Sequence, residues 1–274
     1  MSIKSIVALA DGSDLRSVLS AAVSLTARLS ARLEVLHIKA DPYDAIPIGM
    51  DGMTAGLIDE IVDSAKQAIE KRRVQAKTEY DRVCGPSGQS ASWKEVEGRA
   101  GRMLSISSRF ADLLVVAQPD DKSSDALLEA ADMAIFESGR PVVFIPPTVS
   151  TVKGSRVMIA WNGSTQAALA VTAALPLLRL AEQVDVVQAG EVEESVSANE
   201  LALYLALHGI KVQNHAIDIG IQDIGAILIS AGERFGSDLI VMGAYGHSRL
   251  RERILGGATR GLLEHSPWPI FMMH

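Results

Sequence analysis

Short apolar runs alternate with longer helical stretches along the whole chain of 274 residues. Strands that alternate with helices predict a parallel sheet that is covered on both faces and joined by right-handed crossovers. The expected strands of the first half are Ile3–Leu9, Arg32–Ile38, Ser90–Val96, Leu113–Ala117 and Val142–Ile145. Those of the second half are Arg156–Trp161, Val184–Gln188, Lys211–Ile217, Leu239–Met242 and Ile270–Met273.

The two halves repeat the same signals in the same order. An apolar run ends in Asp11-Gly-Ser in the first half and in Asn162-Gly-Ser in the second. Each half also has an Asp-Leu run before its fourth strand and a closing run that begins after a proline. The segment between the copies contains two prolines and a polar tail, which is typical of a domain boundary. We therefore expect two α/β domains, residues 1–147 and 153–274.

The first copy is longer than the second. Its extra residues lie around residues 41–50 and beyond, in a stretch rich in Gly, Pro and Met. This composition predicts an inserted loop or lid between a strand and a helix. A surface excursion without a task is the alternative interpretation.

Composition and charge narrow the possible classes of protein. With 48% hydrophobic but only 4% aromatic residues, the core must be aliphatic. The net charge of -7 argues against a nucleic-acid partner. A single cysteine, Cys84, excludes an internal disulfide framework, and a reactive role for it is not expected. The histidines show no metal-ligand spacing, so we assign no metal. Because we find neither a signal peptide nor a membrane-spanning run, we expect a cytoplasmic protein with no membrane partner.

The second half carries a two-part glycine motif directly after an apolar run. Gly243-Ala-Tyr-Gly246 is followed by nine residues and then by Gly256-Gly257-Ala258-Thr259. Glycines let a backbone approach an anion closely, and a helix N-terminus offers unpaired N–H groups. A tight strand-to-helix turn without a ligand is the alternative. If the first and fourth strands are neighbours, Asn162 and the glycine turn reach one crevice at the carboxyl ends of the strands.

These features resemble the universal stress protein family in its tandem two-domain form. The resemblance covers nearly the whole chain and implies two doubly wound, five-stranded parallel sheets, Rossmann-like and similar to the adenine-nucleotide alpha hydrolases. It implies that the closing strands pair across a dimer, or across the halves of one chain as an intramolecular pseudo-dimer that leaves room for a homodimer. It also implies a role in stress response or signalling, with ATP, with or without Mg²⁺, bound by members that keep the glycine motif.

Carried over residue by residue, the resemblance places the nucleotide in the second half. Ala160 and Asn162 would face the ribose and base, and Ala189 would lie near the base. The glycine turn would lie near the phosphates. At the start of the next helix, the backbone N–H groups of Gly256, Gly257 and Ala258 and the hydroxyl of Thr259 would bind the phosphates. The complete predicted site is Ala160, Asn162, Ala189, Met242, Gly243, Gly246, His247, Gly256, Gly257, Ala258 and Thr259. Two positions depart from the family pattern: Asn162 replaces Asp, and Gly257 replaces Ser or Thr.

The first half keeps Asp11 but lacks the glycine turn. Ala117-Gln-Pro-Asp120-Asp121 stands in its place, where two carboxylates would repel a triphosphate and the proline offers no N–H. We expect no nucleotide there, and we expect Asp11 to form a turn or cap a helix rather than act in catalysis.

Three hypotheses remain for the whole chain. The first is a nucleotide-binding stress or signalling protein with ATP in its second domain. The second is a nucleotide-free scaffold of the same fold that acts through unidentified protein partners, and the third is a weak ATPase. The common enzyme motifs are absent from the sequence, so no catalytic residue is assigned.

Overall fold

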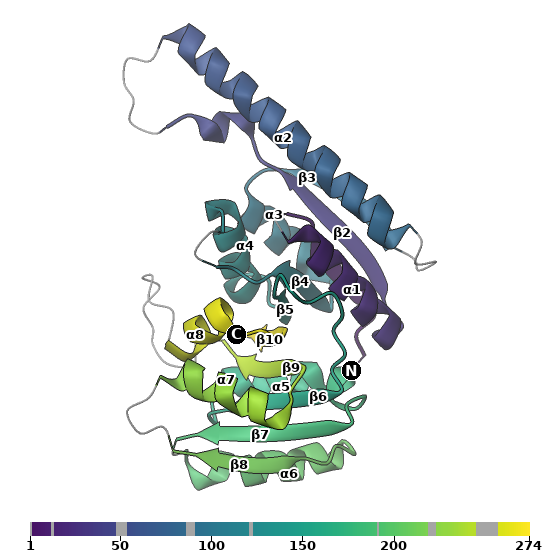
Figure 1. Ribbon diagram of the computed structural model, residues 1–274, viewed down its shortest axis with the longest axis vertical. Helices are drawn as coiled ribbons and strands as arrows, with labels where there is room; N and C mark the ends of the chain where they lie inside the picture. Colours follow the sequence, from purple (N-terminus) through teal and green to yellow (C-terminus); the bar gives the residue numbers. More distant parts are fainter. Residues whose placement is uncertain are drawn as a thin grey trace.

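The ten strands of the described residues form one sheet, in the order β3-β2-β1-β4-β5-β10-β9-β6-β7-β8 (Figure 1). The computed structural model describes residues 2–11, 14–47, 54–85, 91–120, 123–190, 192–218, 223–244 and 257–274. The strands are β1 (Ser5–Leu9), β2 (Arg32–Lys39), β3 (Ala91–Glu97), β4 (Leu113–Ala117), β5 (Val142–Ile145), β6 (Arg156–Trp161), β7 (Gln183–Ala189), β8 (Gln213–Ile217), β9 (Leu239–Gly243) and β10 (Ile270–Met273). These bounds confirm the expected α/β fold.

Helices cover both faces of the sheet, as in a doubly wound fold. They are α1 (Leu15–Leu29), α2 (Ala55–Cys84), α3 (Ala100–Ser107), α4 (Asp125–Phe136), α5 (Thr165–Leu178), α6 (Ala198–Leu207), α7 (Ile224–Phe235) and α8 (Gly257–His265), with short 3-10 turns η1 (Pro42–Ala45), η2 (Ser108–Phe110) and η3 (Glu194–Val196). Helix α1 packs beside α2, α3 beside α4, and α7 beside α8. The central strands β4, β5 and β10 are almost wholly buried, because they have helices on both sides.

The two halves meet where β5 pairs with β10. This pairing is antiparallel, whereas the other strand pairings found among the described residues are parallel. Phe144 lies opposite Ile270, and Phe271 lies opposite Val143, all four fully buried. Gln118 adds a contact between the halves, since its Nε2 donates to the carbonyl of Ser266 at 3.1 Å. The closing strands therefore pair within one chain.

An aspartate anchors the first strand of each half in the same way. Asp112 Oδ2 accepts hydrogen bonds from the backbone N–H groups of Lys4 and Ser5, at 2.7 and 3.0 Å. Asp238 accepts from the backbone N–H groups of Ser155 and Arg156, both at 3.1 Å. The sequence showed these aspartates as matching positions, but their task becomes visible only when the fourth strand lies beside the first.

A polar side-chain pair joins the second and third strands in each half. Lys94 Nζ lies 3.2 Å from Glu34 Oε1 between β3 and β2. At the corresponding place His215 Nε2 lies 2.8 Å from Asp185 Oδ1 between β8 and β7. The side-chain types differ but the register is shared, so the cross-strand polar pair occurs in both copies.

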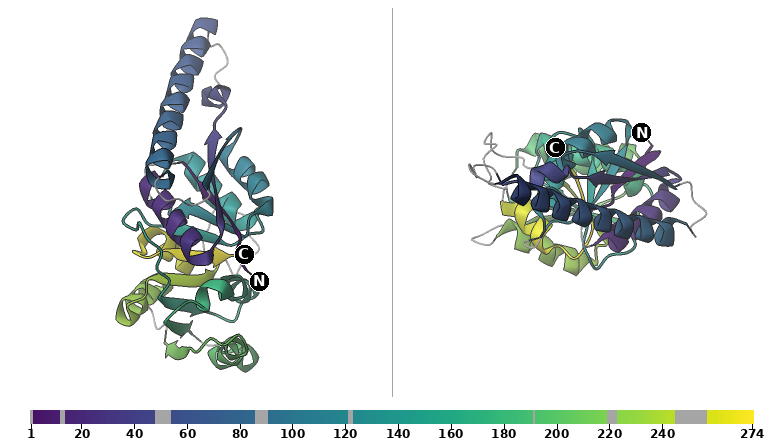
Figure 2. Two further views of the ribbon diagram at one scale, coloured as in Figure 1. Left: turned by 90° about the vertical axis from the view of Figure 1, so that its right-hand side faces the viewer. Right: turned by 90° about the horizontal axis from the view of Figure 1, so that it is seen from above.

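The extra length of the first half lies mostly in a helix, so the expected insertion as a loop or lid is largely wrong. Helix α2 has 30 residues, whereas its counterpart α6 has 10. Of the expected loop, residues 41–47 form η1 and its flanks, where Asp41 Oδ1 accepts from the Tyr43 N–H at 2.9 Å. Residues 48–53 lie outside the described part. Figure 2 shows α2 extending well beyond the sheet.

Within the described residues, no helix combines the length and the apolar character that crossing a membrane requires. Even α2, the longest, carries charged residues along its whole length.

Replacing Asp238 with alanine should lower the free energy of unfolding by about 2–3 kcal/mol, because two backbone N–H groups lose a charged acceptor. Urea titration followed by circular dichroism measures this change. Asp59→Ala, at an exposed position of α2, is the control and should change stability by less than about 0.5 kcal/mol. Equal effects of the two substitutions would show that the Asp238 contacts contribute little.

Candidate functional site

The carboxyl edge of the second half brings together the predicted site residues of β6, β7 and β9. Strand β6 lies beside β9, with Ala160 opposite Met242, so Asn162 and Gly243 follow adjacent strands at one edge. Ala189 ends β7 on the other side of β6. The condition set by the sequence, that the first and fourth strands are neighbours, is confirmed. Ala160 and Met242 themselves are buried, at 9% and 6% exposed.

Asn162 builds the start of α5. Its Oδ1 accepts from the backbone N–H of Ser164 at 3.1 Å and from the Ser164 hydroxyl at 2.7 Å. Ser164 Oγ in turn accepts from the N–H of Ala167 at 3.2 Å and caps the helix. Gly163, with φ of 70°, completes this turn. Asn162 is exposed, and its amide nitrogen has no hydrogen-bond partner among the described residues. It therefore remains available as a donor.

Gly243 has a packing requirement of its own. A Cβ at this position would lie 2.4 Å from the nitrogen of Ala167 and 2.6 Å from the carbonyl carbon of Gln166. The first turn of α5 thus lies directly against the end of β9, and only glycine leaves room for it. The need for glycine at position 243 follows from this contact whether or not a ligand binds.

The turn η3 covers the part of this edge next to β7. Trp161 Nε1 donates to the carbonyl of Val196 at 2.8 Å. The Cγ2 of Val196 also approaches Gly163 so closely that an added Cβ would meet it at 2.9 Å. Trp161 itself is buried, at 7% exposed. Nothing in the sequence near Val196 resembles a binding motif, so this cover could not be predicted from the sequence.

The remaining predicted residues are described only in part. Gly246, His247 and Gly256 lie outside the described residues. Gly257, Ala258 and Thr259 form the backbone of the first turn of α8. A helix N-terminus leaves its first N–H groups without partners inside the helix and carries a partial positive charge.

The first half has a closed turn at the equivalent edge. The backbone N–H of Gln118 donates to Ile145, just as that of Ala244 donates to Met273, so Ala117 and Gly243 correspond. After Gln118 the chain closes on itself, since the Ser123 hydroxyl donates to Asp120 Oδ1 at 2.8 Å. Asp121 lies outside the described residues. Asp11 follows β1, beside β4, and the glycines of the second half have no equivalent at this described edge.

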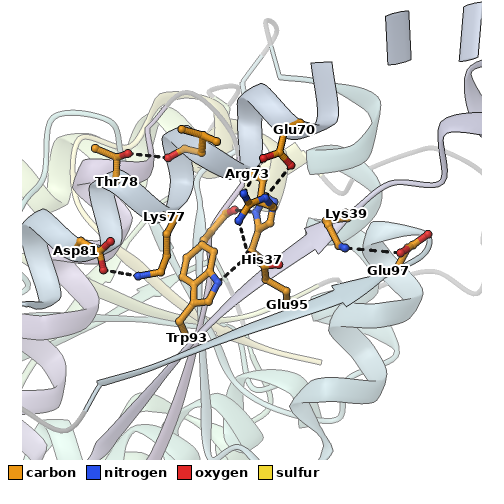
Figure 3. A network of polar contacts seen from close by, with 12 residues as sticks. His37, Lys39, Glu70, Arg73, Lys77, Thr78, Asp81, Trp93, Glu95 and Glu97 are labelled. Carbon is orange, nitrogen blue, oxygen red and sulfur yellow. Dashed lines mark hydrogen bonds and ion pairs between the residues drawn. The ribbon is translucent and has the colours of Figure 1, made fainter. Parts of the chain in front are cut away.

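A polar and aromatic network joins α2 to β2 and β3 (Figure 3). His37 is 3% exposed, stacks on Trp93 at 5.6 Å between ring centroids, and lies with Nδ1 2.9 Å from the carbonyl of Ala10. Nδ1 therefore carries the ring proton. Trp93 Nε1 donates to Glu95 Oε1 at 2.9 Å, and Arg73 reaches the same oxygen at 3.5 Å.

This network anchors the inner part of α2 to the sheet. The Trp93 hydrogen bond, and after it the charge of Arg73, hold the pKa of Glu95 below its usual value. Lys77 lies over the Tyr80 ring at 4.8 Å from its centroid, and Tyr80 donates to the carbonyl of Ala91 at 2.9 Å. The charged side chains of this network pair with one another, so we interpret it as structural.

Comparison with known protein families finds a match for the second half of the chain. The family model described as "Universal stress protein family" matches residues 154–274. Over these residues the chain is similar to the universal stress protein family. No curated protein matches the chain.

Solved structures extend the similarity in fold to the whole chain. A universal stress protein from Archaeoglobus fulgidus has a TM-score of 0.69 and 14% identity, covering 98% of this chain and 97% of that one. A functionally unknown protein from Pseudomonas aeruginosa has a TM-score of 0.57 and 12% identity, covering 99% and 92% of the two chains. A putative universal stress protein from the same species has a TM-score of 0.56 and 13% identity, covering 99% and 93%. These matches fit a two-domain form.

Replacing Gly243 with alanine should lower the free energy of unfolding by about 2 kcal/mol or more, because the new Cβ collides with the backbone of α5. Gly56→Ala is the matched control, since an added Cβ there meets nothing within 4 Å. In a helix this control should be neutral or stabilising by up to about 1 kcal/mol. Unchanged stability of Gly243→Ala in thermal and urea unfolding would contradict the packing requirement.

The Cys84 thiol should react slowly in the folded protein. Burial, and after it the charge of Asp81, raises the pKa of Cys84 to about 11, and its residue is 4% exposed. At pH 8 the thiolate fraction then falls about a hundredfold below that of an ordinary cysteine, and access falls further. Absorbance with Ellman's reagent measures the rate, with the protein in guanidinium chloride as the fast control. Equal rates in both states would contradict the buried thiol.

Proposed function

We propose that the second domain, residues 153–274, binds ATP at the carboxyl edge of β6, β7 and β9, and that the protein acts in stress response or signalling in the cytoplasm. Residues 1–147 form a partner domain that binds no nucleotide. The observation that carries the proposal is the adjacency of β6 and β9, which brings Asn162 and Gly243 to one edge. The start of α8, at Gly257, follows the glycine motif in the sequence.

The residues of this edge have the chemistry that a nucleotide needs. The amide nitrogen of Asn162, which has no hydrogen-bond partner among the described residues, suits a ribose hydroxyl, which accepts hydrogen bonds. The backbone N–H groups of Gly257, Ala258 and Thr259 suit phosphate oxygens, because a helix N-terminus attracts an anion. Asn162 supplies no carboxylate, so a Mg²⁺ ion would come with the phosphates rather than be held by this residue. Gly246, His247 and Gly256 complete the proposed site from the sequence motif.

Nucleotide content is the direct test. The protein is purified quickly and denatured, and the supernatant is analysed by ion-exchange chromatography and by titration with added ATP. We expect a stoichiometric amount of adenine nucleotide, or saturable binding of added ATP. Binding should be lost in Gly246→Asp and Gly256→Asp, because a carboxylate there repels phosphate. Gly243 is not used, since its substitution disturbs the packing of α5.

Gly56→Asp is the charge-matched control, because it lies on α2 in the other half and has open space around it. It should bind ATP like the unchanged protein. A protein that is empty on purification and shows no heat of binding with millimolar ATP would overturn the proposal.

A nucleotide-free scaffold is the second candidate function. The observations that favour it are the turn built by Asn162 and the packing role of Gly243, which explain both residues without a ligand. An empty protein in the same experiment would favour this function. If ATP does bind, phosphate release above a buffer blank separates a weak ATPase from a protein that only holds the nucleotide.

A further inference from the structure

The outer part of α2 stands clear of the rest of the protein (Figures 1 and 2). Of its 30 residues, Val62, Ala76 and Cys84 are the ones described as buried. Toward its N-terminus the helix packs mainly on η1. A helix this exposed gains little stability from tertiary packing, and isolated helices are marginal in water. The outer part of α2 is therefore a surface that further packing would stabilise.

One side of this helix combines an apolar hollow with charges at both ends. A hollow of about 370 Å³ is lined by Ala45 of η1 and, on α2, by Leu57, Glu60, Ile61, Ser64, Ala65 and Ala68. At 3.6 residues per turn, Lys71 and Arg72 continue the same side toward the C-terminus. The side thus runs from an acidic end, through apolar and small residues, to a basic end.

The charges at the two ends have no ion-pair partner among the residues that the structure describes. Glu60, Lys71 and Arg72 are exposed, and none forms an ion pair with another described residue. Most charges on other sides of α2 are paired, as in Lys66 with Asp63 and Arg73 with Glu70, and Asp59 is the exception among the described residues. The unpaired charges therefore concentrate on the side that contains the hollow.

We propose that this side of α2 binds the same side of α2 in a second copy of the protein, with the two helices antiparallel. A two-fold axis midway between Ser64 and Ala68 places Glu60 of each copy opposite Arg72 of the other. The same axis places the small side chains Ser64 and Ala68 at the crossing, where they let two helices approach closely, and Ile61 against the aliphatic stem of Lys71. Each copy presents the same surface, as a closed two-fold dimer requires.

The contact involves one helix from each copy, so its buried area falls at the small end of the range for specific interfaces. We expect a reversible dimer with a dissociation constant on the order of micromolar, stabilised by two equivalent ion pairs that high salt weakens. This interface is separate from the β5–β10 pairing and from the proposed nucleotide edge, so it does not depend on ATP binding.

Sedimentation velocity of the full-length protein over a wide concentration range tests the proposal. The unchanged protein should show a monomer–dimer equilibrium. Glu60→Arg and Arg72→Glu should each weaken dimerisation about tenfold, because each creates two like-charge contacts. The protein that carries both substitutions should dimerise again. An equimolar mixture of the two single variants should form a heterodimer, because each then presents the charge that the other lacks.

Asp59→Arg is the matched control, since it makes the same charge change one residue away, on the flank of Lys66. It should dimerise like the unchanged protein. Two results would overturn the proposal: a monomer at all concentrations, or a dimer that neither Glu60→Arg nor Arg72→Glu weakens. Recovery in the charge-swapped mixture cannot come from a folding defect, so it separates a specific contact from loss of structure.

Discussion

The antiparallel pairing of β5 with β10 is the constraint on which the rest of the architecture depends. Within each half the strands run parallel to one another. Because β5 and β10 are antiparallel, the strands of one half point in the opposite direction to those of the other half across this seam. Ligands of such sheets bind at the carboxyl ends of the parallel strands. In the common sheet, the carboxyl ends of the first half and those of the second half therefore lie at opposite ends of the strands. The closed turn after β4 and the glycine turn after β9 therefore cannot contribute to one shared site.

The seam also determines which strands remain at the ends of the sheet. These are β3 and β8, each only partly buried along its length. Edge strands expose unpaired backbone groups and invite association with other chains. Charged and polar side chains counter this tendency here, as do Lys94 and Glu95 on β3 and the polar residues at the start of β8. The apolar strands lie instead at the seam, where both faces and both edges are covered.

The sequence predicted the strands well because most of them are buried on both faces and so appear as continuous apolar runs. It missed the length of α2, whose solvated sides mask the helical period and whose N-terminal flank is rich in Gly, Pro and Met. At the site, the sequence predicted that Asn162 and Gly243 share one edge only if the first and fourth strands are neighbours, and the pairing of β6 with β9 meets that condition. It did not reveal that Gly243 is required by α5, or that Trp161 fixes η3 over the same edge, because both depend on contacts between distant segments.

Joining both halves in one chain makes the seam independent of protein concentration, since each closing strand has its partner permanently tethered nearby. It also removes an evolutionary restriction. In a symmetric assembly of two identical chains every substitution appears twice, once in each copy. In this chain a substitution appears once, so one half can carry a long projecting helix without the glycine motif while the other carries a short helix with that motif. The fused sheet thus lets two halves of common design specialise separately without any loss in the surface that joins them.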